Sequence, residues 1–160
     1  MPSLAPRTSD PSALPVVRVA PSTRLRTGID VVQMSRMRES IAAFGDRFVK
    51  RIFSADEIAY AGSEEALSTE RFAARFAAKE AAIKAFGLAH VGIDWRDIEV
   101  LRRADGHCSL RLHGKAALHA QISRDEDVAI SLSHDGDYAV AIVTALKRHF
   151  PGNLPDVQPT

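Results

Sequence analysis

The stretch RFAAKEAAIKAF, residues 75–86, decides the fold of this chain. At about 100° per residue, the large apolar side chains here and just before it form a helical stripe about 80° wide. This stripe comprises Phe72, Phe76, Ile83 and Phe86. Alanines occupy much of the remaining surface, so neighbouring elements can approach on several sides. We therefore expect a packed helix from about residue 69 to residue 86, ended by Gly87.

Charged side chains lie at the edge of this stripe. Glu80 projects about 40° beyond Phe76, and Lys84 lies one turn further along. One interpretation is a Glu80–Lys84 surface pair that stabilises the helix by about 0.2–0.5 kcal/mol. The other is a carboxylate for a metal ion and a lysine for phosphate, although a hard cation needs more oxygens than Glu80 supplies. Lys79 falls within the stripe, and we expect its ammonium to extend to water.

A second acidic candidate precedes this helix. Residues 25–32 read as a strand that Gly28 weakens, and Asp30 lies within it. Asp30 is either a turn or helix-capping aspartate or a magnesium ligand that folding brings against Glu80. Sequence spacing leaves both interpretations open.

The remaining segments predict helices first and hairpins later, which is an α+β fold. A helix from Met34 is expected to end at Gly45, and a capping box at Ser54 starts a second, short helix. The later elements are a hairpin of residues 98–102 and 109–112 about Asp105-Gly106, a helix over 115–122, and strands over 128–134 and 138–145.

Composition fits one globular domain. The chain has 160 residues, of which 46% are hydrophobic and 26% charged, with a formal net charge of +1. No global field favours nucleic acid, and no apolar run is long enough to span a membrane. Prolines cluster outside the core, so we expect poorly ordered tails at 1–24 and 149–160 around a domain at 25–148. Cys108 is the only cysteine, which excludes an internal disulfide or a cysteine-based zinc site and is compatible with a reducing cytosol.

Two further groups of residues suggest binding. Alternation places His134, at the end of a strand, on the face of Ile130 and Leu132. Ligand contact and a hydrogen-bonded structural turn both remain open for it, and no nucleophile elbow accompanies its neighbouring serines. Arg36 lies on the first helix, with further basic residues at Arg38, Arg47, Lys50 and Arg51. They form either a solvated face or a docking surface for an acidic protein helix.

Taken together, these segments resemble the holo-acyl-carrier-protein synthase family, the small trimeric class of 4′-phosphopantetheinyl transferases. The resemblance covers about residues 28–144, and its motifs occur in the family's order. They are Gly28-Ile29-Asp30-Val31-Val32 with Arg36, Phe53-Ser54-Ala55-Asp56-Glu57, residues 75–87, Trp95-Arg96-Asp97-Ile98-Glu99-Val100, and Ser131-Leu132-Ser133-His134 with Tyr138-Ala139-Val140-Ala141.

The resemblance implies a specific activity. Such enzymes transfer phosphopantetheine from coenzyme A to a serine of an acyl carrier protein and release adenosine 3′,5′-bisphosphate. Asp30 and Glu80 match the family's magnesium ligands, Lys84 a lysine near the diphosphate, His134 a histidine at the coenzyme A site, and Arg36 a position that docks the carrier. The family's fold packs an antiparallel sheet with helices, and its active sites lie between subunits of a trimer. We expect a cytoplasmic, Mg²⁺-dependent transferase.

The implied chemistry agrees with the residue types. Attack on a diphosphate builds negative charge on phosphoryl oxygens, which Mg²⁺ and Lys84 can stabilise. Glu80, directly or through a water, is the candidate general base for the carrier serine.

Three departures from the family pattern stand out. Arg26 replaces a usual glycine, Gln33 a commonly acidic residue, and Gly106-His107-Cys108 a usual Gly-Lys-Pro. Two rival functions remain. One is a non-catalytic module that binds coenzyme A or a carrier protein, and the other is an interaction protein that uses the basic first helix.

Overall fold

The computed structural model describes residues 25–122 and 126–147, so both expected tails lie outside the described residues. In chain order the elements are β1 (Leu25–Gln33), α1 (Met34–Ile52), α2 (Ala55–Gly62), α3 (Glu65–Phe86), the 3₁₀ helix η1 (Trp95–Asp97), β2 (Ile98–Arg102), β3 (Cys108–Leu112), α4 (Gly114–Ala120), β4 (Glu126–Asp135) and β5 (Tyr138–Lys147). No helix among these residues is both long and apolar enough to cross a bilayer.

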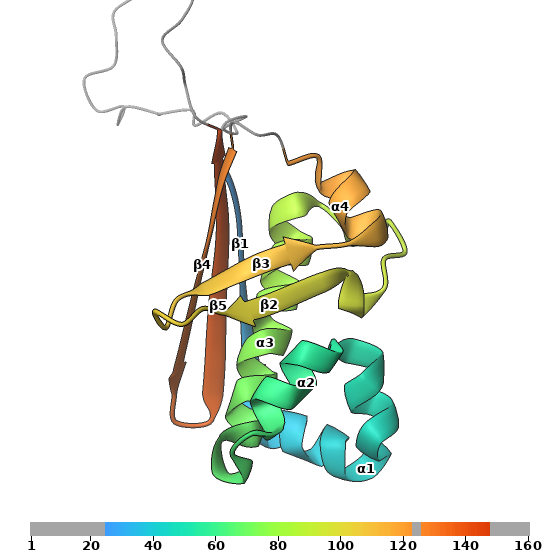
Figure 1. Cartoon of the computed structure of the whole chain (residues 1–160), viewed down its shortest axis with the longest axis vertical. Helices are drawn as coiled ribbons and strands as arrows, with labels where there is room; N and C mark the ends of the chain where they lie inside the picture. Colours follow the sequence, from blue (N-terminus) through green and yellow to red (C-terminus); the bar gives the residue numbers. More distant parts are fainter. Residues whose placement is uncertain (1–24, 123–125, 148–160) are drawn as a thin grey trace, which may run out of the picture.

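Two antiparallel sheets pack against α3, the helix that contains residues 75–86. One sheet has the strand order β1-β5-β4, and the other is the β2–β3 hairpin. Figure 1 shows α3 running beside the larger sheet, with the hairpin crossing over it and α1 and α2 grouped near its N-terminal end. This arrangement confirms the predicted α+β fold.

Alanines allow α3 to lie unusually close to its neighbours. Ala77, Ala78, Ala81 and Ala82 are fully buried in the core between the two sheets. Opposite them, a Cβ at Gly28 would lie 2.1 Å from the Ala81 carbonyl oxygen. Gly28 is therefore required where β1 meets α3, and it does more than weaken a strand.

Gly45 divides the first helix into two segments. α1 continues past Gly45 to Ile52, with only Gly45 itself outside helical geometry (φ 57°, ψ −148°). The positive φ of this glycine ends the first segment at a kink. The first segment therefore ends at Gly45 as predicted, whereas the helical segment that follows was not predicted.

The turn between β4 and β5 caps the start of α1. Asp137 in this turn accepts hydrogen bonds from the Ser35 backbone nitrogen at 2.9 Å and the Ser35 hydroxyl at 2.6 Å. Gln33 donates its amide to the same carboxylate at 2.9 Å. A carboxylate at position 33 has no proton to donate, so this departure from the family pattern has a local structural role.

Arg26, another departure from the family pattern, connects several elements at the end of the molecule opposite this turn. Its guanidinium donates to both carboxylate oxygens of Glu126, at 2.9 and 2.7 Å, and to the Ala120 carbonyl at 2.6 Å. It also lies 4.9 Å from the centre of the Phe86 ring. One side chain thus ties β1 to β4, α4 and the end of α3.

A buried ion pair replaces the solvent-exposed lysine that we expected. Lys79 is fully buried, with its Nζ 2.8 Å from a Glu57 oxygen. It also donates to the Trp95 and Ile98 carbonyls. Burial lowers the pKa of Lys79, whereas Glu57 acts to raise it. The ammonium does not extend to water because α2 and β2 pack over that side of α3.

Other local predictions were accurate. Ser54 and Glu57 form the capping box at the start of α2. Gly87 ends α3 with left-handed backbone geometry (φ 67°), as expected for a helix C-terminus. The predicted hairpin turns at Asp105-Gly106, where Gly106 has a φ of 87°.

Candidate functional site

Asp30 and Glu80 line the same pocket although fifty residues of sequence separate them. The pocket is about 650 Å³ in volume, and Arg36, Phe48 and Phe76 also line it. Asp30 is paired with Ala141 inside β1, so its interpretation as a turn or capping residue is wrong. The contact between Gly28 and α3 is what brings β1 close enough for the two carboxylates to share one cavity.

The two carboxylates influence each other electrostatically. Burial raises the pKa of Glu80, the nearby Asp30 charge raises it further, and Lys84 acts to lower it. Lys84 does not form the surface pair with Glu80 considered above. Instead, its Nζ lies 2.8 Å from Asp30 Oδ1 and donates to the Ile29 carbonyl at 3.0 Å. The site therefore combines two carboxylates with one half-exposed ammonium.

This donor set fits Mg²⁺. In the part of the chain that the structure describes, no three His, Cys, Asp or Glu side chains gather to enclose a metal ion. Mg²⁺ is commonly bound by one or two carboxylates together with waters and substrate phosphates, which is what Asp30 and Glu80 offer. A cation between them would also relieve the repulsion that raises the pKa of Glu80.

His134 lies in a different pocket. Its Nε2 is 3.1 Å from a carboxylate oxygen of Glu70, on α3. Both residues line a cavity of about 180 Å³ that includes none of the residues around Glu80. A single chain therefore does not bring His134 together with Asp30 and Glu80.

Arg75 is a candidate that sequence reasoning missed. It lines the His134 cavity, is only 3% exposed, and its Nε has no hydrogen-bond partner among the described residues. Its guanidinium lies 4.1 Å from the centre of the Tyr60 ring and donates to the Arg71 carbonyl. Burial lowers the pKa of Arg75, and the nearby Tyr60 and Glu57 side chains partly offset this lowering. A buried guanidinium with a free donor suits an anion.

The sequence position of Arg75 gives only a weak indication that its side chain binds an anion. It precedes Glu80 by five residues, which is about 140° around α3. The two side chains therefore serve different sides of one helix. The spacing in the sequence indicates that the two side chains lie on different sides of α3. That a cavity lies on the side of Arg75 is evident only once the β2–β3 hairpin is folded.

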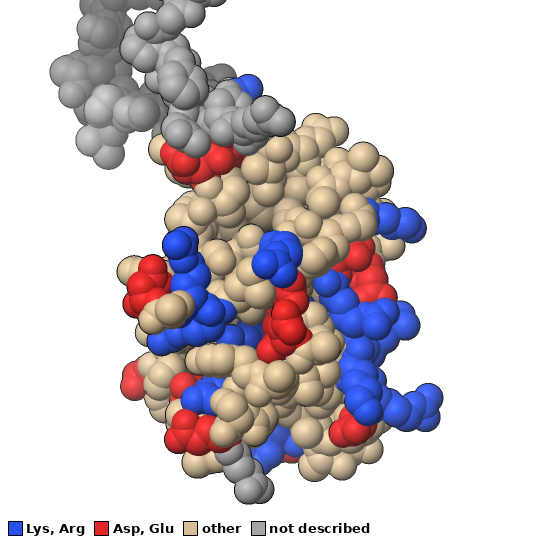
Figure 2. Space-filling view, viewed as in Figure 1, with Lys and Arg blue, Asp and Glu red and all other residues tan. Residues whose placement is uncertain are grey.

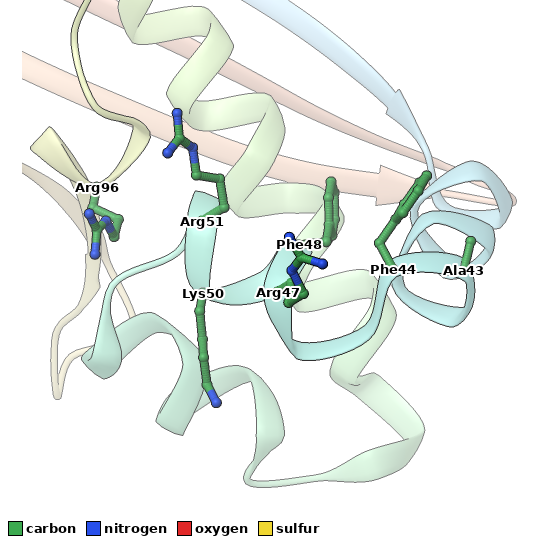
Figure 3. Close-up of a pocket in the computed structure, with 7 residues that line it drawn as sticks. All are labelled: Ala43, Phe44, Arg47, Phe48, Lys50, Arg51 and Arg96. Carbon is green, nitrogen blue, oxygen red and sulfur yellow. The ribbon is translucent and has the colours of Figure 1, made fainter.

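A basic and apolar surface lies along α1. The pocket there is about 830 Å³ in volume, and its lining residues are Ala43, Phe44, Arg47, Phe48, Lys50, Arg51 and Arg96. Figure 3 shows Phe44 and Phe48 toward one end and Arg51 and Arg96 toward the other. Figure 2 shows Lys and Arg side chains gathered on this edge of the molecule. Phe44 is 66% exposed, so this surface is not a merely charged, solvated face.

The basic surface adjoins the carboxylate pocket. Phe48 lines both cavities, and Arg36, which precedes the kink at Gly45 on α1, lines the pocket of Asp30 and Glu80. A partner that contacts α1 would therefore reach the mouth of the carboxylate pocket.

Comparison with known proteins supplies independent findings. The family model of the 4′-phosphopantetheinyl transferase superfamily matches residues 26–143. The holo-[acyl-carrier-protein] synthase of Koribacter versatilis is 49% identical over 120 residues, covering 74% of this chain and 95% of that protein. That of Solibacter usitatus is 42% identical over 118 residues, covering 73% and 94%.

Solved structures agree with these relatives. The ACPS–CoA complex of Chronobacterium ammoniagenes matches with a TM-score of 0.66 at 34% identity, over 78% of this chain and 98% of that one. The holo-(acyl-carrier-protein) synthase of Bacillus anthracis in complex with CoA (3′,5′-ADP) matches with a TM-score of 0.61 at 32% identity, over 77% and 96%.

Proposed function

We propose a mechanism for this chain, which belongs to the 4′-phosphopantetheinyl transferase superfamily and, within it, to the holo-[acyl-carrier-protein] synthases. It transfers 4′-phosphopantetheine from coenzyme A to a serine of an apo-acyl carrier protein and releases adenosine 3′,5′-bisphosphate. The observation that carries our mechanism is the shared pocket of Asp30 and Glu80, with Lys84 beside them. We assign the activity to residues 25–148.

Asp30 and Glu80 would bind Mg²⁺ in this pocket. When bound, the ion supplies positive charge that offsets the charge developing on the coenzyme A diphosphate. Lys84 adds a second positive charge. Its side chain is 50% exposed, so its ammonium can turn from Asp30 toward a phosphate without unpacking α3.

The transfer itself is a displacement at phosphorus. The carrier serine oxygen attacks the β-phosphorus of coenzyme A, and the bond between that phosphorus and the bridging oxygen breaks. The bridging oxygen leaves with adenosine 3′,5′-bisphosphate, and the serine proton passes to Glu80. Burial of the Glu80 carboxylate, which is the largest influence on its pKa, favours uptake of this proton.

The His134 cavity would hold the nucleotide half of coenzyme A. Arg75 has a free donor there, and Arg71 and Arg102 add positive charge at the same cavity. Coenzyme A carries phosphates at both its ribose and its diphosphate, so it needs cationic partners in two places. Because one chain keeps this cavity apart from Asp30 and Glu80, we propose a homotrimer in which neighbouring subunits complete each site.

The carrier protein would bind along α1. An acidic helix of the carrier suits Arg36 and Arg47 through charge and Phe44 through apolar contact. Phe48 joins this surface to the carboxylate pocket, so a docked carrier can extend its serine toward Glu80. We place the protein in the cytoplasm, together with its proposed partners coenzyme A and the carrier.

Intact-mass spectrometry tests the proposal. Apo-acyl carrier proteins from fatty acid and polyketide synthesis are mixed with the protein, coenzyme A and Mg²⁺. We expect a gain of one phosphopantetheine that is lost with a chelator and with Glu80→Gln, but retained with Asp135→Asn, an exposed carboxylate that lines neither pocket. If coenzyme A binds while every carrier stays unmodified, the non-catalytic binding module becomes the correct description.

A further inference from the structure

Cys108, the only thiol of the chain, lines the cavity that also contains His134. It begins β3 and is half-buried, so part of its surface faces solvent. Its partner across the hairpin is Arg102, which lines the same cavity. Directly paired residues project from one face of a sheet, so the side chains of Cys108 and Arg102 leave the hairpin side by side.

Three arginines and one carboxylate line the cavity. The arginines are Arg71, Arg75 and Arg102, the carboxylate belongs to Glu70, and Arg71 also pairs with Glu64 at 2.9 Å. Arg75 is 3% exposed, and its Nε has no partner among the described residues. One buried guanidinium nitrogen without a partner points to an anionic ligand independently of the thiol, because a buried donor without a partner is costly. Figure 2 shows blue side chains gathered near the turn end of the β2–β3 hairpin.

We propose that Cys108 is a modification site at which the thiol forms a mixed disulfide with an anionic thiol, such as glutathione or coenzyme A, and that this adduct closes the cavity to the nucleotide half of the substrate. The second part rests on the proposed function, which places coenzyme A in this cavity. The first part rests only on the thiol and its cationic surroundings.

The chemistry is a thiol–disulfide exchange. The Cys108 thiolate attacks one sulfur of the small disulfide, a new sulfur–sulfur bond forms, and the original one breaks. The other half leaves as a thiolate and takes up the proton that Cys108 lost. Positive charge around the cavity concentrates anionic disulfides beside the thiol and disfavours cationic ones.

The first test compares modification rates by intact mass. Glutathione disulfide, coenzyme A disulfide and the cationic disulfide cystamine are each reacted with the folded protein and with the urea-unfolded chain. Relative to the unfolded chain, we expect both anionic reagents to react about tenfold faster than cystamine. A larger preference for coenzyme A disulfide would identify phosphate as the better-recognised group, and a larger one for glutathione disulfide would identify carboxylate.

Two matched variants show whether the cavity causes this preference. Arg102→Gln should slow the anionic reagents about threefold, because it removes one charge opposite the thiol. Arg103→Gln removes the same charge from the next residue, whose side chain is exposed and pairs with Asp105, and should leave the rates unchanged. Equal rates for all three disulfides, or equal effects of the two variants, would overturn the proposal.

The consequence for substrate is measured with adenosine 3′,5′-bisphosphate. We expect it to protect Cys108, and we expect glutathionylation to weaken its binding at least tenfold, with recovery in dithiothreitol. Cys108→Ser, treated in the same way, should keep its affinity. Fast, charge-dependent modification without protection would support the thiol site and overturn the coenzyme A assignment of this cavity, whereas the carrier-mass experiment tests transfer independently.

Discussion

At Glu80, catalysis and folding stability favour different charge states. Its pocket raises its pKa, so the folded state disfavours the charge that catalysis uses. At neutral pH we expect Glu80→Gln to lower the transfer rate about 10³-fold. The same change should raise the free energy of unfolding by about 0.5 kcal/mol, a small gain because this position is partly exposed and screened.

The pH dependence of that gain follows from its sign. A carboxyl whose pKa is raised by folding costs stability above that pKa and nothing once both states are protonated. The advantage of Glu80→Gln should therefore disappear as pH falls below the ordinary glutamate range. Urea unfolding measured across pH checks this, and a gain that grows toward low pH would contradict the assignment.

The proposed carrier-docking role of Arg36 depends on its positive charge. Arg36→Glu should raise the KM for the acyl carrier protein about tenfold through repulsion, with little change in the KM for coenzyme A. Lys115→Glu, which makes the same charge change on exposed α4, serves as the control. Steady-state kinetics with each substrate varied in turn separates the two constants, and a rise confined to coenzyme A would oppose the docking role.

The role of an individual residue could be predicted only where its own position in the sequence indicated that role. Glu80 stood out as a carboxylate beside an apolar helical stripe, and Asp30 stood out as a carboxylate in an otherwise apolar strand. Lys79 and Arg75 did not, because the stripe shows that a side chain faces inward and says nothing of what covers it. Their partners come from Glu57 and Tyr60, on a helix whose placement depends on the whole fold.

Between elements, the tightest contact is that of β1 with α3. We expect Gly28→Ala to lower the free energy of unfolding by about 3 kcal/mol and to reduce activity, since the added Cβ meets backbone atoms of Ala81 and Ala85. Gly62→Ala is the matched control, because nothing lies within 4 Å of a Cβ there. Denaturant unfolding of both variants makes the comparison, and equal stability would rule out the close contact.

Lys79 joins three elements through one ammonium. Lys79→Met should lower the free energy of unfolding by about 3 kcal/mol, because it leaves the Glu57 charge buried without its partner. Lys50→Met removes an exposed lysine that pairs with the exposed Asp46, and it should change stability by less than about 0.5 kcal/mol. If the two variants unfold at the same denaturant concentration, the buried pair is not contributing as described.

Element boundaries were predicted well where a local hydrogen bond sets them. Ser54 begins α2 and Gly87 ends α3, because each position satisfies backbone groups by itself. The start of α3 was set too late, since its N-cap residue, Glu64, makes no side-chain capping bond. The helical segment after Gly45 was not predicted, because its packing into the core through Val49 and Ile52 depends on the whole fold.

Within one chain, the two proposed halves of the active site lie apart. One is the pocket of Asp30 and Glu80, and the other is the cavity of His134. If neighbouring subunits complete each site, co-expressing Asp30→Ala with His134→Ala should restore activity that neither variant has alone. Random assembly leaves about a quarter of the sites with both intact halves. Size-exclusion chromatography with transfer assays tests this, and activity no greater than that of the separate variants would mean that each chain works by itself.

Phe48 borders both the α1 surface and the carboxylate pocket, so under the proposed mechanism one ring would contact the carrier and also shape the cavity for transfer. Over evolutionary time, a lineage cannot alter this position to adopt a new carrier without also reshaping the cavity in which transfer takes place. Phe44 and Arg47 border the outer surface alone and are free of that constraint. Changes of carrier preference should therefore accumulate at these outer positions while Phe48 stays fixed.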